Sequence, residues 1–111
     1  MSKYKYFKNV TNNSADFYLY GDIVDDSTDW WTGERDPFLF SPNDLKEELD
    51  QLQGINELNI YINSGGGSVF ASSTMVNLLR RFKEKNNATI NSYVDGICAS
   101  ASTYLLMVAD N

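Results

Sequence analysis

The sequence predicts an α/β domain of repeated β-α units, with parallel strands joined by right-handed crossovers. Three β-prone runs, at 17–24, 57–62 and 89–94, each precede a turn or loop and then a stretch that suits a helix. The alternation of strand and helix favours a parallel sheet, because a crossover helix joins parallel strands compactly. Functional sites in such units gather where strands end and helices begin.

The N-terminal part begins with an expected edge strand at 3–10, where aromatic residues and lysines alternate. A polar turn over 11–14 leads into the strand at 17–24, which we expect to continue through Gly21. The acidic stretch 25–29 raises the possibility of a calcium loop. Its carboxylates lack the alternating ligand spacing, the central glycine and the distal glutamate of such loops, so a solvated loop is the better interpretation.

Large apolar side chains then gather in a stretch that Gly33 and Pro37 otherwise mark as loop. They are Trp30, Trp31, Phe38, Leu39 and Phe40. Exposed aromatic side chains are costly unless they are covered. Two interpretations stand side by side: a flap over the core, or a surface for a neighbouring subunit or a peptide.

A helix start follows, with Ser41 as N-cap and Pro42 at the first helical position. The helix is expected to run to about residue 53, with leucines of one face directed at the core, and Gly54 ends it. The next strand, 57–62, alternates apolar and polar residues and therefore buries one face. It leads into a tight turn at 63–68.

The turn opens a second helix, expected over 69–85 and ended by Asn86 and Asn87. Its expected buried stripe consists of Val69, Met75, Val76, Leu79 and Phe82. Phe70, Asn77 and Leu78 fall on a different face, which we expect to serve as a seam between subunits.

After the strand at 89–94, Gly96 and a run of small residues place Ser100 at the first turn of a further helix. Unpaired N–H groups and the helix dipole favour negative charge there, which suits a serine nucleophile and a developing oxyanion. The alternative role for Ser100 is that of a helix cap.

The turn at 63–68 contains three consecutive glycines, Gly65, Gly66 and Gly67. Bare amides of this kind can adopt unusual backbone angles and point at a ligand oxygen, as an oxyanion hole requires. Because both glycine-marked turns follow parallel strands, we expect Gly66, Gly67 and Ser100 to meet at one sheet edge. Valine in place of Gly67 should then abolish activity with less damage to folding.

The segments 62–69 and 96–101, taken together, resemble the Clp-type serine proteases, which have the ClpP/crotonase fold. In that family an Asn-Ser-Pro-Gly-Gly turn precedes a Gly-x-Ala-Ala-Ser-Met-type nucleophile segment at about this interval. The resemblance extends from Phe17 onward. It is nearest to phage head-maturation (prohead) proteases, which also carry a Trp-rich loop after a Gly-Asp-Ile strand, as at 20–23 and 30–33.

The resemblance implies a serine endopeptidase with Ser100 as catalytic nucleophile and a backbone oxyanion hole at Gly66, Gly67 and Ala101. It further implies a homo-oligomeric ring, a polypeptide substrate, and an ATPase or capsid proteins as partners. No cofactor or metal is expected. Three positions depart from the family pattern: Gly65 replaces proline, Cys98 replaces alanine and Ala101 replaces methionine.

The chain contains no histidine, so the family's serine, histidine and aspartate triad cannot form from these residues alone. We therefore expect residues 1–111 to be a single domain, truncated on the C-terminal side before the histidine and aspartate, and inactive by itself. Two other functions remain open. One is a crotonase-like acyl-thioester enzyme, which uses two backbone amides and no serine nucleophile; the other is an inactive Clp-like scaffold or interaction module.

Composition excludes other classes of function. A formal net charge of −6 disfavours nucleic-acid binding, and the one basic cluster, at 80–85, suits the C-terminal end of a helix. No signal peptide or membrane-length apolar run is present, so we expect no membrane association and a cytoplasmic location, in the host cytoplasm if phage-encoded. A single cysteine cannot form an internal disulfide.

Overall fold

The computed structural model describes residues 6–24, 39–52, 54–98, 103 and 108–110, apart from the side chain of residue 97. In chain order the elements are β1 (Phe7–Lys8), β2 (Ser14–Tyr20), β3 (Asp22–Ile23), β4 (Leu39–Phe40), α1 (Pro42–Gln51), β5 (Glu57–Ser64), α2 (Val69–Asn86) and β6 (Thr89–Cys98).

The main sheet has the strand order β1-β2-β5-β6. Strands β2, β5 and β6 are mutually parallel, whereas β1 pairs with β2 in the antiparallel sense. Strands β3 and β4 form a separate parallel pair. The predicted α/β class with parallel strands is therefore confirmed, and the antiparallel β1 is an addition at the edge.

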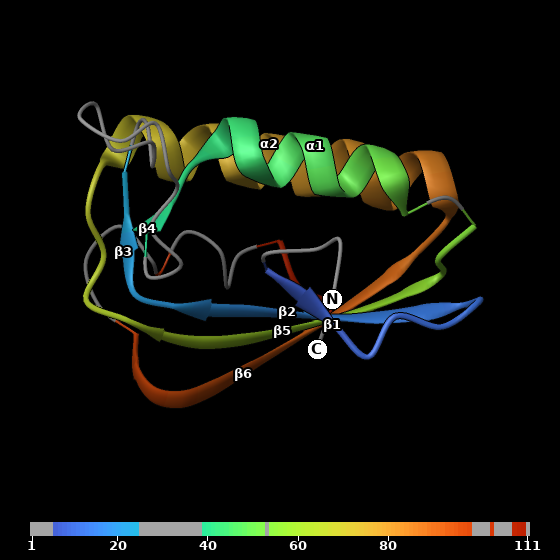
Figure 1. The fold of residues 1–111 in the computed structure, drawn as a ribbon, viewed down its shortest axis with the longest axis horizontal. Coiled ribbons are helices and arrows are strands. Elements are labelled where there is room, and N and C mark those ends of the chain that lie inside the picture. The colour runs from blue at the N-terminus through green and yellow to red at the C-terminus, as the bar shows by residue number, and fades with distance from the viewer. Residues whose placement is uncertain (1–5, 25–38, 53, 99–102, 104–107, 111) are drawn as a thin grey trace, which may run out of the picture.

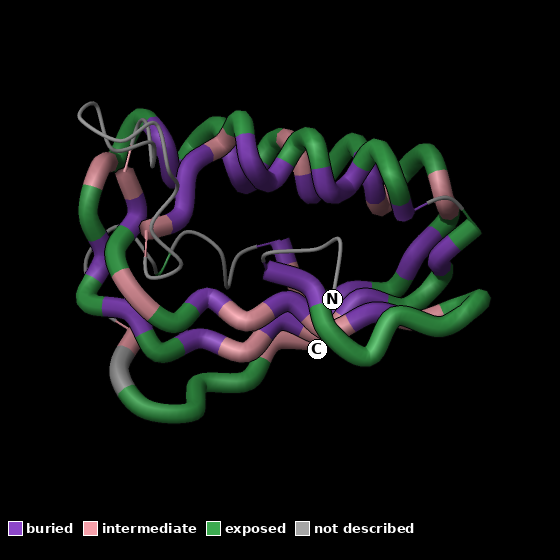
Figure 2. The backbone as a smooth tube through the Cα atoms, viewed as in Figure 1, coloured by how far each residue is buried: buried purple, intermediate pink, exposed green. Residues whose placement is uncertain are grey.

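The two helices lie side by side over one face of the sheet, so the described part has two layers (Figure 1). Buried residues line the facing sides of these layers (Figure 2). Strand β5 shows why: Leu58, Ile60 and Ile62 are fully buried, and the residues between them are more exposed. This period of two places one face of each strand against the apolar stripes of the helices.

Both helices start where predicted because the start signals are local, whereas α1 ends at Gln51, before the expected end at about residue 53. The hydroxyl of Ser41 accepts the N–H of Asp44 at the start of α1, where Pro42 is the first helical residue. The hydroxyl of Ser68 accepts the N–H of Ala71 (3.1 Å) at the start of α2. Asn87 ends α2 in the left-handed conformation, with φ of 50°.

The expected strand at 17–24 is wrong in both of its boundaries. Strand β2 already begins at Ser14, within the stretch expected to be a turn, and it ends at Tyr20. Gly21 has a φ of 146° and donates its N–H to the carbonyl of Asn63 (3.2 Å). This change of direction takes the chain out of the main sheet, so that Asp22 and Ile23 pair with β4 instead.

Buried carboxylates of α1 hold the N-terminal edge of the sheet. One oxygen of Glu48 accepts the N–H groups of Tyr6 (2.8 Å) and Phe7 (3.4 Å). The Tyr6 hydroxyl donates to Asp44 (3.0 Å). Of the edge strand expected at 3–10, only Phe7–Lys8 is a strand among the described residues. Residues 25–38, with the acidic stretch, Trp30, Trp31 and Phe38, lie outside the described residues.

The last described residues return to β6. The N–H of Asp110 donates to the carbonyl of Ile90 (2.7 Å), and its carboxylate accepts the N–H of Ile90 (2.9 Å). The same carboxylate pairs with Lys83 on α2. The hydrogen bond from Lys83, followed by that from Ile90, lowers the pKa of Asp110. Asp110 is thereby bonded both to the sheet, through β6, and to the helix layer, through α2.

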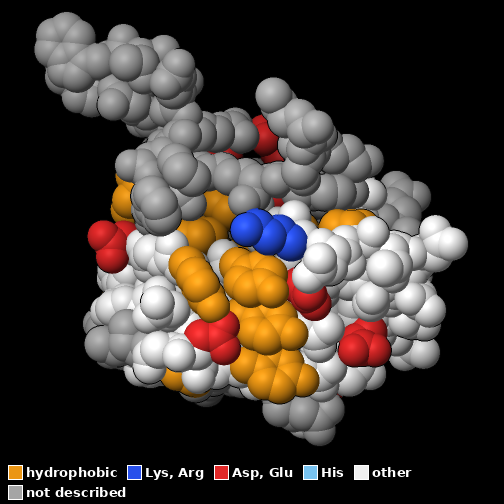
Figure 3. Space-filling model, turned by 60° about the horizontal axis from the view of Figure 1, so that its bottom comes forward, with side chains coloured by type: hydrophobic (Ala, Val, Ile, Leu, Met, Phe, Trp, Pro, Cys, Tyr) orange, Lys and Arg blue, Asp and Glu red, His pale blue; other side chains and the backbone are white. Residues whose placement is uncertain are grey.

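The outer face of the sheet carries a row of aromatic side chains, which we call the tyrosine ladder. Tyr18, Tyr61 and Tyr93 stand at equivalent positions on β2, β5 and β6, with ring centroids 4.8 and 5.1 Å apart in succession. A hydrophobic row crosses this face between acidic side chains (Figure 3). Cross-strand ring contacts of this kind reinforce the strand register.

Candidate active site

The glycine turn after β5 is fastened to β3. The N–H of Ile23 donates to the carbonyl of Gly66 (2.9 Å), and the N–H of Ser68 donates to the carbonyl of Ile23 (2.9 Å). These two bonds make an isolated parallel bridge between Ile23 and Gly67. The short strand that leaves the main sheet at Gly21 therefore serves to hold the turn in place.

The contact with β3 leaves no room for a side chain at Gly67. Its φ is +141°, and a Cβ there would lie 2.0 Å from the carbonyl oxygen of Ile23. The expectation that valine at this position would damage folding less than activity is therefore wrong. Its added Cβ would collide with the backbone that holds the turn, so folding and function would suffer together.

Gly66 and Gly67, both predicted as oxyanion donors, direct their backbone N–H groups differently. Because Gly66 and Ser68 both bond to Ile23, the alternation of a parallel bridge directs the N–H of Gly67 away from β3. The N–H of Gly66 instead donates to the hydroxyl of Ser64 (3.1 Å), which is buried. Of the two glycines, Gly67 is thus the better placed to donate to a ligand.

Strand β6 ends beside this turn after an irregular stretch. Ile62 pairs with Val94, but the next pair is Ser64 with Cys98, so β6 spends two more residues than β5 over the same interval. Gly96 lies within this bulge, and a Cβ there would be 2.5 Å from the side-chain oxygen of Asn63. Bulges of this kind redirect a strand, and they are common next to active sites.

Because of the bulge, the last strand ends later than predicted. The expected end is Val94, whereas β6 extends to Cys98, which is half-buried. Cys98 therefore lies at the edge where Ser64 opens the glycine turn. Ser100 and Ala101, the predicted nucleophile and second oxyanion donor, lie outside the described residues.

The start of α2 brings two exposed apolar side chains to the same edge. Val69 is 54% exposed and Phe70 is 86% exposed. The assignment of Val69 to the buried stripe is therefore wrong, although Met75, Val76, Leu79 and Phe82 are buried as predicted. The first turn of α2 adjoins the glycine turn, and the buried stripe begins only at Ala71.

A hydrogen bond that sequence reasoning missed spans the same end of the sheet. The Tyr20 hydroxyl on β2 donates to the carboxylate of Asp95 on β6. This bond to Asp95 raises the pKa of Tyr20 to about 12, because ionising the tyrosine would break the bond and place two negative charges together. The two residues are 75 positions apart, so no local pattern could have predicted the pair.

The sequence matches a known protein family. Residues 47–111, more than half of the chain, match the family described as Clp protease. The chain belongs to the Clp protease family. The matched region includes β5, the glycine turn, α2 and β6.

A solved structure has a similar fold. A point mutant of ClpP1 from Listeria monocytogenes superimposes with a TM-score of 0.58 at 23% sequence identity. The alignment covers 85% of this chain but 46% of that protein, so the chain spans about half the length of the relative. At this identity the likeness shows the fold alone. No match was found among curated proteins.

Two further observations concern membranes and metals. No helix within the described ranges is both long and apolar enough to cross a membrane. Among these same residues, no three histidine, cysteine, aspartate or glutamate side chains come together as metal ligands would.

Proposed function

We propose that this chain is part of a serine endopeptidase in which Ser100 is the nucleophile and the N–H groups of Gly67 and Ala101 bind the oxyanion. The observation that carries the proposal is the convergence of two strand ends: Ser64, which opens the glycine turn, pairs with Cys98, two residues before Ser100. Gly67 supports it, because its N–H is directed away from β3.

In the proposed reaction the Ser100 hydroxyl oxygen attacks the carbonyl carbon of a peptide bond while a general base accepts the serine proton. The carbonyl oxygen becomes negatively charged and is stabilised by the two backbone N–H groups. The C–N bond then breaks, the departing amine takes the proton from the base, and an acyl-serine remains. Water hydrolyses the ester and restores the serine.

The general base is proposed to come from outside these 111 residues, since the chain has no histidine. In this proposal residues 1–111 form the N-terminal portion of a single Clp-protease-like domain, and the histidine and aspartate of the triad follow it. The proposal is supported by the greater length of the structural relative, of which the alignment covers 46%.

The test is covalent labelling of the full-length protein with a fluorophosphonate, read by intact mass. We expect one adduct on the wild type and on Ser102→Ala, and none on Ser100→Ala. An unlabelled wild type that retains its helical circular dichroism would contradict the peptidase and favour a crotonase-like enzyme or a scaffold. A label that persists in Ser100→Ala would contradict the assigned nucleophile.

For the assembly and substrate, we propose a homo-oligomeric ring that cleaves polypeptides during phage capsid maturation, with capsid proteins as substrates and an ATPase as a further candidate partner. The Trp-rich segment is the feature that supports the phage assignment. Co-expression of the full-length protein with the capsid and scaffolding proteins of the same genome tests it. Processing that depends on Ser100 is expected, and unprocessed capsid protein beside an active peptidase would contradict it.

A further inference from the structure

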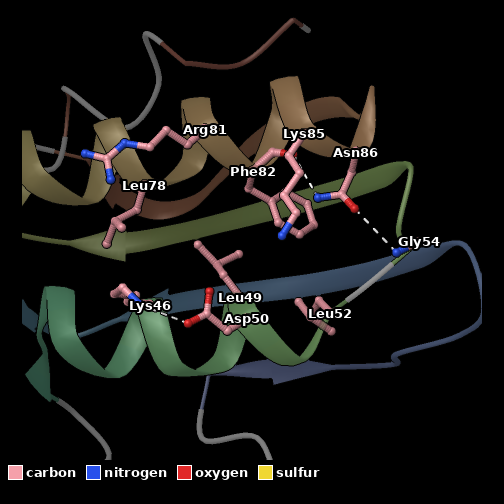
Figure 4. Close-up of a pocket in the computed structure, with 10 residues that line it drawn as sticks. All are labelled: Lys46, Leu49, Asp50, Leu52, Gly54, Leu78, Arg81, Phe82, Lys85 and Asn86. Carbon is pink, nitrogen blue, oxygen red and sulfur yellow. Dashed lines mark hydrogen bonds and ion pairs between the residues drawn. The ribbon is translucent and has the colours of Figure 1, made fainter.

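A groove between the two helices lies away from the carboxyl edge of the sheet. It opens between the C-terminal halves of α1 and α2 and has a volume of about 280 Å³. Four residues of α2, namely Leu78, Arg81, Phe82 and Lys85, line it with the i, i+3, i+4, i+7 spacing of one helix face. Figure 4 shows that Asn86 closes one end through its bond to the N–H of Gly54.

The groove combines an apolar lining with a cationic rim. Leu49, Leu78 and Phe82 contribute apolar surface, and Lys46, Arg81 and Lys85 bring positive charge from both helices. Lys46 forms an ion pair with Asp50 (3.0 Å). Within the described part of the chain, neither Arg81 nor Lys85 has an acidic partner.

The helix dipole explains only part of this charge. It favours cations in the last turn of α2, where Lys83 and Lys85 lie. It does not account for Arg81, which lies further back in α2; Lys46 is already paired with Asp50, which also lines the groove. A cationic rim around an apolar hollow, in a chain with a net charge of −6, suits a ligand that is both acidic and aromatic.

The chain itself contains such a segment. Residues 25–31 read Asp-Asp-Ser-Thr-Asp-Trp-Trp, which places three carboxylates next to two indole rings. We propose that the α1–α2 groove of one copy binds the acidic tryptophan segment, residues 25–31, of a neighbouring copy. An indole ring fits a hollow of about 280 Å³, and the carboxylates pair with Arg81 and Lys85 at the rim.

The layout of the fold favours a neighbour over the same chain. The segment leaves the described structure after β3 and returns at β4, at the end of the molecule where α1 and α2 begin (Figure 1). The groove lies toward the opposite end, where both helices finish. At the usual helical rise, the groove residues Leu78 and Lys85 lie roughly 14 Å and 24 Å along α2 from Val69.

The first test is a binding titration with a synthetic peptide of residues 25–31, labelled at its N-terminus and followed by fluorescence anisotropy on the full-length protein. We expect Arg81→Glu and Lys85→Glu each to weaken binding by about tenfold. Arg80→Glu is the matched control, because it makes the same charge change at the adjacent exposed position outside the groove. A peptide with both tryptophans replaced by alanine should bind far more weakly.

The second test is self-association, measured by light scattering over a concentration series. Arg81→Glu and the double variant Trp30→Ala, Trp31→Ala should each lower association, while Arg80→Glu should match the wild type. Equal losses for Arg80→Glu and Arg81→Glu would overturn the proposal and indicate general electrostatics. Peptide binding to a protein that stays monomeric would also overturn it and indicate docking within one chain. Neither measurement depends on proteolysis, so failure of this proposal and failure of the proposed peptidase can be distinguished.

Discussion

At the scale of single residues, neighbouring glycines of one turn have different requirements. Gly67 is confined by the backbone of Ile23 and has a φ of +141°. A Cβ at Gly65 would meet no heavy atom within 4 Å, and the φ of this residue is not positive. The sequence shows three equivalent glycines, because the contact that distinguishes them comes from a distant strand.

This difference predicts a loss of stability for one alanine variant and almost no change for the other. Gly67→Ala should lower the free energy of unfolding by about 1–3 kcal/mol or more, since it combines a strained φ with a backbone clash. Gly65→Ala should remain within about 0.5 kcal/mol of the wild type. Urea unfolding of the two variants checks this, and equal stabilities would contradict the role given to Ile23.

The bond between Tyr20 and Asp95 predicts a titration that can be observed. Tyrosinate absorbance should reveal one tyrosine that ionises near pH 12 in the wild type, and it should be absent from Tyr20→Phe. In Asp95→Asn the same group should move toward its ordinary pKa of about 10. Because the folded pKa is raised, any stability from this bond is complete below pH 10 and declines as pH rises toward 12. An unchanged titration in Asp95→Asn would contradict the bond.

At the scale of secondary-structure elements, the sequence predicted what local signals determine. Helix α1 begins at its predicted cap, Ser41, because a cap acts on N–H groups three residues away. Helix α2 begins at the predicted residue, Val69, directly after the glycine turn, and the structure adds Ser68 as its cap. The strand at 57–62 was predicted because its alternation matches a half-buried sheet. The glycine turn between β5 and α2 was predicted as a turn because its composition is a local signal, and its role as a site stays a prediction.

What the sequence did not predict depends on distant partners. Strand β2 stops at Tyr20 because the following residues pair with β4, and no pattern near Gly21 identifies that partner. Strand β6 passes the expected end at Val94 because a bulge lets Cys98 pair with Ser64. Val69 was misplaced because its helical position fits the buried stripe, whereas the first turn of α2 lies outside the core.

The anchoring of β1 by α1 gives a prediction at this scale. Glu48→Ala should lower the free energy of unfolding by about 1–3 kcal/mol, because the N–H groups of Tyr6 and Phe7 lose their buried acceptor. Glu48→Gln keeps an acceptor oxygen and should cost less. The exposed neighbour Glu47→Ala is the control.

Urea unfolding gives the stabilities of these variants, and amide hydrogen exchange locates the effect. In Glu48→Ala, faster exchange should concentrate at Tyr6 and Phe7 rather than spread through β5. If Glu48→Ala and Glu47→Ala unfold alike, the carboxylate of Glu48 does not hold the edge strand.

At the scale of the whole molecule, one end of the sheet concentrates the features on which the proposed peptidase site is based. The glycine turn is held by β3, β6 arrives beside it after a bulge, and Val69 and Phe70 add exposed apolar surface next to the turn. The opposite part of the helix layer carries the groove with its cationic rim. Proposed catalysis and proposed self-association therefore occupy separate regions, and variants can address them one at a time.

The lack of histidine gives a prediction about residues 1–111 alone. Because this stretch has no histidine, we expect at most a small residual hydrolysis of a fluorogenic peptide that does not depend on Ser100. Serine-protease sites that lack a triad member keep only a small residual catalysis from binding and oxyanion contacts. Ser100→Ala should therefore change nothing measurable, and circular dichroism should show both proteins folded. Hydrolysis above the buffer rate that disappears in Ser100→Ala but persists in Ser102→Ala would contradict the prediction, since it would require a base within this stretch.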